Sequence, residues 1–575
     1  MKNAAALASF CILVVLYPWI IRGTYPLGVG IITGALAAGT VGFVLLLGYA
    51  HQLALGQAGF CMVGGYASAL LCVNHKWDPL AALLVGAAAA MAIAWLVATP
   101  ILKLRGFVLA MASLALHLIL VVVAFETPFT GGALGTYGIP KFGLFGLHLA
   151  SDLAYYYVVW TIVLAFVGIG LAVDRSRIGR ALKAIAASET AALSTGMDIR
   201  RYKVQMFVLS AGMASVCGSL AVHYLRAMDP NVFGFAFSLN FITAVIVGGL
   251  MTVWGGVVGA ALITGLRELL RGLSLPLWEG VIMGALTVIV LIAFRRGFAG
   301  FLSLLYDRLF GRQETPRVAL VEPDVSALRP IANAATLEVR GAARSFGNLR
   351  AVNGVSFTVA AGSVTALIGP NGAGKTTLFN LVCGYQPLDA GEVTLDARRI
   401  ETLLPNQIAA LGVGRTFQNL QLFDNMNVLD NVICGGHRHL WGESTGREKA
   451  RAALAFVGLQ GAASLMPGEL AFGHQRLVEI ARALALEPRL LLMDEPASGL
   501  NDSETERLAE LTLRIAALGI TVLLVEHDMR LVMGLADHVV VMHHGEKIAD
   551  GAPDAIRRDR AVIEAYLGIE EHAAA

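Results

Sequence analysis

The stretch Gly369-Pro-Asn-Gly-Ala-Gly-Lys375-Thr376-Thr377 determines the fold class of the second half of this chain. It matches the phosphate-binding pattern G-x-x-x-x-G-K-[ST] and follows an apolar run, residues 364–368, that predicts a buried strand. Glycines let backbone N–H groups point at phosphate oxygens, Lys375 can reach the β- and γ-phosphates, and the Thr376 hydroxyl can bind Mg²⁺. The predicted nucleotide loop consists of Gly369, Pro370, Asn371, Gly372, Ala373, Gly374, Lys375, Thr376 and Thr377.

Two carboxylates downstream extend this prediction. The apolar run 490–493 leads directly into Asp494 and Glu495. Asp494 is suited to hold Mg²⁺ through the coordination shell of the ion, and Glu495 is suited to polarise the attacking water. A surface acidic pair is the alternative, but an apolar run that ends in two carboxylates is not a surface pattern.

Three more side chains fit the same chemistry. His527 follows a second apolar strand, 521–525, and can contact the γ-phosphate. Gln418, in Gly414-Arg-Thr-Phe-Gln-Asn, can sense the nucleotide and Mg²⁺, and Phe346 is placed upstream of the loop to stack on adenine. The predicted catalytic residues are therefore Glu495, His527, Gln418 and Lys375, and the predicted Mg²⁺ ligands are Thr376, Gln418 and Asp494.

Composition divides the chain into two unequal halves. Residues 1–300 hold 27 of the 84 charged residues, whereas the last 275 residues hold the other 57. A mean hydropathy of +0.68 is too high for an ordinary soluble protein. This pattern indicates a membrane domain followed by a soluble domain. The six cysteines are far apart with no metal-type spacing, so we expect free thiols.

The first half contains apolar runs long enough to cross a bilayer, which needs about 20 helical residues. The first run, behind Lys2, is predicted to be a retained anchor rather than a cleaved signal peptide. The runs are residues 4–21, 27–50, 56–73, 80–102, 106–124, 153–173, 204–225, 238–266 and 278–294.

Basic residues predict the orientation of these spans. Residues 174–203 carry seven of the eighteen basic residues in the first 300, whereas 125–152 contains only Lys141. The basic segment should be cytoplasmic and 125–152 outside, and Arg295 and Arg296 should also be cytoplasmic. An even number of crossings must then separate the two cytoplasmic segments, although only three apolar runs lie between them.

The run 238–266 can provide the additional crossing, because Gly248-Gly249 and Trp254-Gly255-Gly256 interrupt it. We expect it to enter and return as two short helices, or to be re-entrant. Broken backbone at membrane depth is tolerated only where it packs in protein or lines a wet cavity, so 248–256 is a candidate for the transport path. Close helix packing through small residues is the alternative.

A second interruption lies at 48–59, where polar side chains and glycines separate two apolar runs. This pattern suggests an unwound segment in which His51, Gln52 and Gln57 face a translocation path. The alternative is that they satisfy backbone groups freed by the break. His117 is isolated in its run, so we expect it to be packed and hydrogen-bonded rather than to relay protons.

Beyond the membrane half, residues 306–336 read as a linker with three prolines. Short apolar strands then alternate with helical patterns, which predicts an α/β domain of one nucleotide fold. The expected strands are 337–340, 354–359, 363–368, 490–493, 521–526 and 538–542. The predicted division is 1–305 membrane domain, 306–336 linker, 337–568 ATP-binding domain and 569–575 tail.

Taken together, these motifs resemble the nucleotide-binding domain of ATP-binding cassette (ABC) transporters over about 337–550. Leu470-Ala-Phe-Gly473-His-Gln475-Arg476 resembles the family's signature motif L-S-G-G-Q. The resemblance implies a P-loop α/β domain with a helical subdomain, in which Ala471, Gly473 and Gln475 contact ATP bound to a facing cassette. Ala471 in place of serine, His474 after the glycine and Asn501 in place of aspartate depart from the family pattern.

A finer resemblance links both halves to branched-chain amino-acid importers. The cassette is similar in 414–423 and 551–568. The membrane half is similar to one permease subunit of such importers in 48–59, 103–106, 131–140, 176–183 and 248–256. In the family these parts usually lie on separate chains, so the resemblance implies a fusion. It also implies that residues 177–196 form a cytoplasmic coupling helix that docks near Gln418.

Three hypotheses follow. The first is half of an ATP-driven importer of branched-chain or hydrophobic amino acids in the cytoplasmic (inner) membrane, multi-pass, with the cassette in the cytoplasm. It would need ATP, Mg²⁺, a second permease and ATPase, a periplasmic binding protein and membrane lipid; an importer of urea or short amides is a close variant. The second is an exporter half-transporter, and the third is a degenerate regulatory subunit. Nothing in the sequence suggests a nucleic-acid partner.

Overall fold

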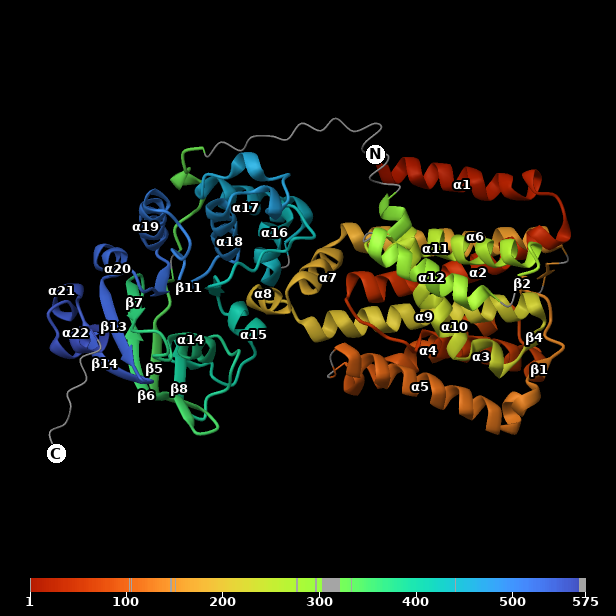
Figure 1. The fold of residues 1–575 in the computed structure, drawn as a ribbon, viewed down its shortest axis with the longest axis horizontal. Helices are drawn as coiled ribbons and strands as arrows, with labels where there is room; N and C mark the ends of the chain where they lie inside the picture. The colour runs from red at the N-terminus through yellow and green to blue at the C-terminus, as the bar shows by residue number, and fades with distance from the viewer. Residues whose placement is uncertain are drawn as a thin grey trace. The chain divides into compact units, whose positions relative to one another are not determined.

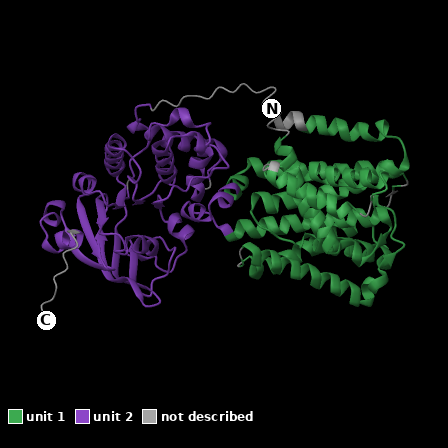
Figure 2. Cartoon of the chain, in the orientation of Figure 1, with its two compact units in different colours: residues 1–182, 200–314 green, residues 183–199, 315–575 purple. Residues whose placement is uncertain are grey.

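The protein is described here from a computed structural model. The structure describes residues 2–102, 104, 106–144, 147–149, 151–275, 278–294, 297–301, 321–331, 333–439 and 441–567. The chain forms two compact units, coloured separately in Figure 2. One unit comprises residues 1–182 and 200–314, and the other comprises residues 183–199 and 315–575. Arg295 and Arg296, which we used to orient the spans, lie outside the described residues.

The first unit consists mainly of helices, and each predicted apolar run contains helix. Six described helical segments are long and apolar enough to cross a membrane by length and composition. The helices are α1 (Lys2–Ile20), α2 (Thr24–Val44), α3 (Gln57–His75), α4 (Pro79–Ile101), α5 (Gly106–Glu126), α6 (Asp152–Arg175), α9 (Ile199–Leu225), α10 (Phe235–Gly248), α11 (Val253–Gly272) and α12 (Glu279–Ala293). The predicted polytopic helical domain is confirmed.

Helices α2 and α9 form the centre of this unit, because 89% and 83% of their apolar windows are buried against only 28% for α4 and α5. Small residues allow the close approach: a Cβ on Gly34 would lie 2.6 Å from Val159, and one on Gly42 would lie 2.7 Å from Met213. Polar contacts add to this packing, since the hydroxyls of Thr33 and Thr264 lie 2.8 Å apart. Such small-residue contacts are typical of helix association in membranes.

The run 238–266 consists of two helices, α10 and α11, as predicted. Helix α10 ends at Gly248, and Gly249 adopts a φ of 123° in the break before α11. The expectation of a second interruption at Trp254-Gly255-Gly256 is wrong, because these residues lie within α11. A Cβ on Gly256 would lie 2.7 Å from the backbone nitrogen of Val41, so this glycine serves close packing.

The predicted unwound segment near residues 48–59 is confirmed. Helix α2 continues into a π-helical turn, Leu45–Tyr49, and residues 50–56 are non-helical before α3 starts at Gln57. His51 is exposed and adopts a left-handed φ of 49°. His117 is fully buried in α5 and packs beside Gly59 of α3, as expected for a packed residue.

Residues 125–152, predicted to lie outside, contain short elements. Strand β1 (Thr136–Tyr137) pairs antiparallel with β4 (Ala227–Met228), and β2 (Gly143–Leu144) pairs with β3 (Leu147–His148). The β1–β4 pairing joins the loop between α5 and α6 to the segment that follows α9, whereas the β2–β3 pairing lies within that loop.

The second unit contains the predicted α/β domain (Figure 1). Its larger sheet has the order β10-β11-β12-β7-β13-β14 and is parallel except for β14. A smaller antiparallel sheet has the order β6-β5-β8-β9. The strands are β5 (Leu337–Phe346), β6 (Leu349–Val359), β7 (Val364–Ile368), β8 (Ala390–Leu395), β9 (Arg398–Arg399), β10 (Val413–Arg415), β11 (Leu490–Asp494), β12 (Thr521–Val525), β13 (His538–His543) and β14 (Glu546–Gly551).

All six predicted strands are present. Every residue of β7, β11 and β12 is buried, as expected for parallel strands that are covered on both faces. The helices of this unit are α8 (Glu189–Ser194), α14 (Lys375–Val382), α15 (Pro405–Ala410), α16 (Val428–Gly435), α17 (Glu443–Phe456), α18 (Phe472–Leu484), α19 (Asp502–Ala517), α20 (Met529–Leu535), α21 (Pro553–Ile556) and α22 (Arg560–Leu567). Helices α16, α17 and α18 pack together as a helical subdomain (Figure 1).

Two segments from outside the predicted ATP-binding domain belong to this unit. Helix α7 (Arg177–Ala187) crosses the division between the units, and residues 183–199 belong to the second. Residues 321–331, within the predicted linker, are tied to the α/β domain by backbone hydrogen bonds from Val321 to Gly458 and from Ile331 to Leu518. Residues 302–320 and 568–575, which include most of the remaining linker and the predicted tail, lie outside the described residues.

Candidate functional site

The register of the parallel sheet brings the predicted phosphate residues together. Asp494 at the end of β11 pairs with Val525 at the end of β12, and Val525 pairs with Leu367 near the end of β7. Glu495, His527 and the nucleotide loop that begins at Gly369 therefore leave the same edge of the sheet. The carboxyl edge of parallel strands is where ligands bind in open α/β sheets.

The loop has the backbone that its glycines predict. Gly369, Gly372 and Gly374 adopt φ values of 151°, 82° and 97°, which side-chain-bearing residues rarely tolerate. A Cβ on Gly374 would also lie 2.2 Å from the carbonyl oxygen of Ala351 in β6, so only glycine fits. The chain then enters α14 at Lys375, and the first turn of this helix carries Thr376 and Thr377.

Lys375 lies over this loop. Its Nζ donates to the carbonyl oxygens of Gly369 at 2.7 Å and Pro370 at 3.0 Å. Burial lowers the pKa of the Lys375 ammonium group, and the nearby carboxylates of Glu495 and Asp494 oppose that effect. A phosphate placed against the loop would meet this ammonium group together with the helix N-terminus.

Asp494 provides a test of whether Mg²⁺ fits the site. Its side chain is 2% exposed, and Oδ2 accepts a hydrogen bond from Arg415 at 3.3 Å, whereas Oδ1 has no partner. Burial raises the pKa of the Asp494 carboxyl group, and the Arg415 guanidinium opposes this. No cluster of three or more His, Cys, Asp or Glu side chains among the described residues could hold a metal ion alone. A buried carboxylate oxygen without a partner and the exposed Thr376 hydroxyl fit Mg²⁺ that also binds substrate phosphates.

Glu495 stands beside this site in a strained conformation. Its φ is 43°, which is costly for a residue with a side chain and typical of functional sites. Gln418 Nε2 donates to Glu495 Oε2 at 3.0 Å, and His527 Nδ1 lies 3.8 Å from the same oxygen. The Glu495 side chain is 14% exposed and that of His527 is 58% exposed, so a water molecule can reach both.

Phe346 and the signature residues lie elsewhere in the unit. Phe346 is 44% exposed at the β5–β6 hairpin, whose strand β6 reaches the loop at Ala351. Ala471 precedes α18 as its N-cap and makes no side-chain capping bond. Gly473 lies in the first turn of α18, and Gln475 Nε2 donates to the carbonyl oxygen of Leu470 at 2.9 Å. The structure therefore groups Ala471, Gly473 and Gln475 at the N-terminus of α18, whereas Lys375 starts α14.

Asn501 has a clear local role despite its departure from the family pattern. It is the N-cap of α19, and its Oδ1 accepts from the backbone N–H of Glu504 at 3.0 Å. Glu504 Oε2 in turn accepts a hydrogen bond from the backbone N–H of Asn501 at 3.1 Å, which completes a capping box.

Sequence reasoning missed three buried charges on α18, which we call the arginine–glutamate block (Arg476, Glu479 and Arg482). Arg476 donates to the carbonyl oxygens of Phe417 at 2.6 Å and Gln418 at 3.0 Å, and Arg482 donates to that of Gln421 at 2.6 Å. Glu479 accepts from the backbone N–H of Gln421 and from Arg476. The block thus fixes the backbone on both sides of Gln418. Charges spaced three apart on the buried face of a helix were the available signal.

Residues 183–199 contact this same region of the unit. The Ser188 hydroxyl donates to Gln421 Oε1 at 2.8 Å, and Asn425 Nδ2 donates to the carbonyl oxygen of Lys183 at 2.8 Å. The Tyr385 hydroxyl donates to the carbonyl oxygen of Thr190 in α8 at 2.7 Å. The segment is therefore held close to the backbone that carries Gln418.

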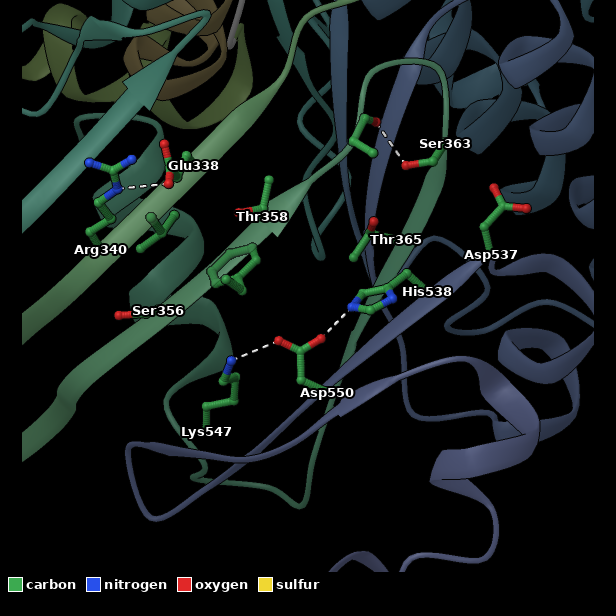
Figure 3. A pocket seen from close by; sticks show the side chains of 13 residues that line it. Glu338, Arg340, Ser356, Thr358, Ser363, Thr365, Asp537, His538, Lys547 and Asp550 are labelled. Atoms are coloured by element: carbon green, nitrogen blue, oxygen red, sulfur yellow. Dashed lines mark hydrogen bonds and ion pairs between the residues drawn. The ribbon is translucent and has the colours of Figure 1, made fainter.

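A different hollow of about 590 Å³ lies between β5, β6 and the start of β7 and β13 (Figure 3). Asp550 pairs there with both His538 and Lys547. Thr365 and His538, near the amino ends of their strands, line it. Because the phosphate loop follows the carboxyl end of β7, this hollow is not part of the candidate site.

Comparison with known proteins gives matches in both units. Residues 352–498 match a family described as "ABC transporter", residues 5–291 match "Branched-chain amino acid transport system / permease component", and residues 546–572 match "Branched-chain amino acid ATP-binding cassette transporter".

Individual relatives match the cassette. The chain is 44% identical over 248 residues to the high-affinity branched-chain amino acid transport ATP-binding protein BraF of Pseudomonas aeruginosa, covering 40% of this chain and 97% of the relative. It is 40% identical over 248 residues to the corresponding protein LivG of Escherichia coli K12, with the same coverage. A solved nucleotide-free ATP-binding cassette from an ABC transporter is 33% identical, with a TM-score of 0.38, covering 40% of this chain and 98% of that one.

Proposed function

We propose that this chain, which belongs to the ATP-binding cassette transporter family, is one half of an ATP-driven importer of branched-chain and similar hydrophobic amino acids. The observation that carries the proposal is the joining, in one chain, of a branched-chain amino-acid permease component and a cassette 44% identical to a branched-chain amino-acid transport ATPase. The permease match favours this function over an exporter. The intact set of Lys375, Asp494, Glu495 and His527 favours it over a degenerate subunit.

The proposed hydrolysis uses the side chains at the carboxyl edge of the sheet. Lys375 would exchange its two carbonyl partners for the β- and γ-phosphates, and the loop N–H groups would bind the remaining oxygens. Mg²⁺, held by Thr376, Asp494 and Gln418, would neutralise charge on the phosphates. Glu495 would orient the water and accept its proton, and His527 would contact the γ-phosphate. Phe346 would stack on the adenine ring.

A complete transporter would contain a second cassette and a second permease. Ala471, Gly473 and Gln475 would then bind the nucleotide held by the facing cassette, where the N-terminus of α18 favours a phosphate. We further propose that the protein lies in the cytoplasmic membrane with the cassette in the cytoplasm, and that a periplasmic binding protein delivers the amino acid. The proposed boundaries are 1–305 for the permease, 306–336 for the linker, 337–568 for the cassette and 569–575 for the tail.

Residues 183–199 would connect ATP hydrolysis to transport. Their hydrogen bonds reach Gln421, Asn425 and Tyr385 of the cassette. Gln421 lies three residues after Gln418, which contacts Glu495. Movement of the Gln418 backbone when ATP binds would therefore be passed to this segment.

Substrate uptake tests the proposed function. Cells that carry the complete system should accumulate labelled leucine in an energy-dependent way, and unlabelled isoleucine and valine should compete. Accumulation of urea without accumulation of leucine would replace the amino-acid assignment with the urea alternative.

Ala471→Ser is expected to be tolerated, with ATP hydrolysis within two-fold of the native rate. Ala471 is an N-cap without a side-chain hydrogen bond, and serine is a preferred residue there, worth about 0.5–2 kcal/mol. Steady-state ATPase assays and thermal unfolding would measure the effect. A severe loss of activity would show that the alanine is required by the geometry of the site.

Tyr385→Phe is expected to lower leucine uptake several-fold while changing ATP hydrolysis less than two-fold. The change removes the hydrogen bond to the Thr190 carbonyl oxygen, worth about 1 kcal/mol, and keeps the ring. The ratio of leucine transported to ATP hydrolysed is the measurement. Tyr137→Phe, at an exposed tyrosine of the membrane unit, is the control. Equal loss of both activities would contradict a coupling role.

A further inference from the structure

We propose that the break between α2 and α3 forms a substrate site within the membrane unit. In this site the amides of Gln52 and Gln57 and the N-terminus of α3 contact the charged α-carboxylate and α-ammonium groups of the transported amino acid. The inference rests on the proposed function and adds the site at which the polar groups of the substrate are bound.

The first observation is that two interrupted segments meet. A Cβ on Gly48, in the π-helical turn after α2, would lie 1.8 Å from the carbonyl oxygen of Leu250, which lies in the α10–α11 break. Residues 50–56 follow this π-helical turn and are non-helical. Helix α2 is 89% buried over its apolar window, and at this junction Gly48 and Gln52 are buried whereas His51 and Leu53 are exposed. In transporters, adjacent helix breaks in the membrane interior are typical of substrate sites.

The second observation concerns the two glutamine side chains. Gln52 is 1% exposed and Gln57 is 2% exposed, and neither amide oxygen nor amide nitrogen of either residue has a hydrogen-bond partner. These amides therefore do not satisfy backbone groups freed by the break, which was the alternative to a role in the translocation path. Buried polar groups without partners are costly and rare in folded proteins, so their retention points to a ligand.

Other polar groups around the break make hydrogen bonds. Thr40 in α2 donates to the carbonyl oxygen of Gly256 at 2.8 Å. Ser113 in α5 accepts from the backbone N–H of Leu55 at 2.9 Å and donates to the carbonyl oxygen of Ala110. These hydrogen bonds hold the break and the helix before it in place, and both glutamine amides in this region lack partners.

The chemistry of the site suits an amino-acid zwitterion. Helix α3 has 19 residues and starts at Gln57, and its N-cap, Gly56, offers no side-chain hydrogen bond to the first turn. A larger residue would not fit, since a Cβ on Gly56 would lie 2.5 Å from the Ser113 carbonyl oxygen. The N–H groups at a helix N-terminus without a side-chain cap and the positive end of the helix dipole favour a carboxylate. The glutamine side chains supply amide oxygens for the ammonium group and amide nitrogens for the carboxylate.

Replacing the amides with an apolar side chain of similar length separates a functional role from a structural one. Gln52→Met and Gln57→Met should leave the Tm of the assembled transporter unchanged or raised, because each removes buried polar atoms without partners. Uptake of labelled leucine into proteoliposomes that contain the whole complex and its binding protein should fall at least ten-fold. Gln57→Glu should abolish uptake, because it places a negative charge where the carboxylate binds.

The matched control is Thr40→Val, which removes a buried hydroxyl whose hydrogen bond is made. It should lower the Tm and leave leucine uptake within two-fold per folded complex. Uptake within two-fold in both Gln→Met variants would overturn the site, as would a loss of uptake that follows a loss of Tm. If the native complex hydrolyses ATP but does not accumulate leucine, the proposed function fails as well, and the two failures are thereby distinguished.

Discussion

Glu495→Gln is expected to lower ATP hydrolysis by about 10²–10⁴-fold, the usual contribution of a general base, and to abolish leucine uptake while ATP still binds. The substitution preserves shape and leaves an amide oxygen that can accept the 3.0 Å hydrogen bond from Gln418. An amide cannot accept the proton of the attacking water. The loss should therefore appear in kcat rather than in nucleotide affinity.

Single-turnover hydrolysis and equilibrium ATP binding on the complete transporter would measure this split. Glu510→Gln is the matched control, because Glu510 is 69% exposed and forms only a surface ion pair with Arg514. Weak surface pairs contribute little, so this control should behave like the native protein. Rapid turnover by the Glu495→Gln protein would show that another residue positions the water.

The nucleotide side chains were predictable because each follows a short apolar strand. The runs before Gly369, Glu495 and His527 read as buried strands, and parallel strands place their carboxyl ends together. The contacts that these nucleotide side chains make with residues distant in sequence could not be predicted from the same pattern. The pairing of Arg415 with Asp494, across 79 residues, depends on the neighbouring positions of β10 and β11 in the sheet. A local sequence pattern does not predict which strands become neighbours in the sheet.

Glycine pairs in the membrane half show a related limit. Gly248-Gly249 ends a helix, whereas Gly255-Gly256, a few residues later, lies inside one. The dipeptides are identical, and both lie against neighbouring backbone, since a Cβ on Gly248 would lie 1.9 Å from the carbonyl oxygen of Gly255. A Cβ on Gly256 would meet the backbone of Val41 in α2, so the glycine permits two helices to touch. The sequence thus indicated where backbones come close or break, but the choice between the two required the tertiary structure.

The arginine–glutamate block contains three charged side chains whose burial costs desolvation free energy. Arg476, Glu479 and Arg482 are 1%, 0% and 2% exposed. Burial raises the pKa of the Glu479 carboxyl group, and the guanidinium groups of Arg482 and Arg476 oppose this. A buried ion pair is weak evidence for net stability, but removing one partner leaves an uncompensated charge. The block is therefore a place where a single substitution should have a large effect.

Arg476→Met is expected to lower the free energy of unfolding of the cassette by about 3–5 kcal/mol, because Glu479 loses its 3.1 Å cationic partner and keeps Arg482 at 3.8 Å and the Gln421 N–H. For a domain of this size that corresponds to a fall in Tm of roughly 10 °C. Differential scanning calorimetry of the full-length chain would measure it, with the cassette transition identified by its upward shift when ATP is added.

Arg476→Met should also slow ATP hydrolysis, because Arg476 positions the backbone of Gln418 by donating to the carbonyl oxygens of Phe417 and Gln418. Arg476 takes no part in the chemical step itself. Without Arg476 the pKa of Glu479 rises further in the folded state, so the folded protein binds more protons than the unfolded one. The deficit in stability should then grow as the pH rises above the ordinary pKa of glutamate. Arg476→Met combined with Glu479→Gln removes the orphaned charge and should recover much of the stability but not the rate of hydrolysis. Additive losses of stability in the double variant would show that the two side chains act independently, and would contradict the block as a unit.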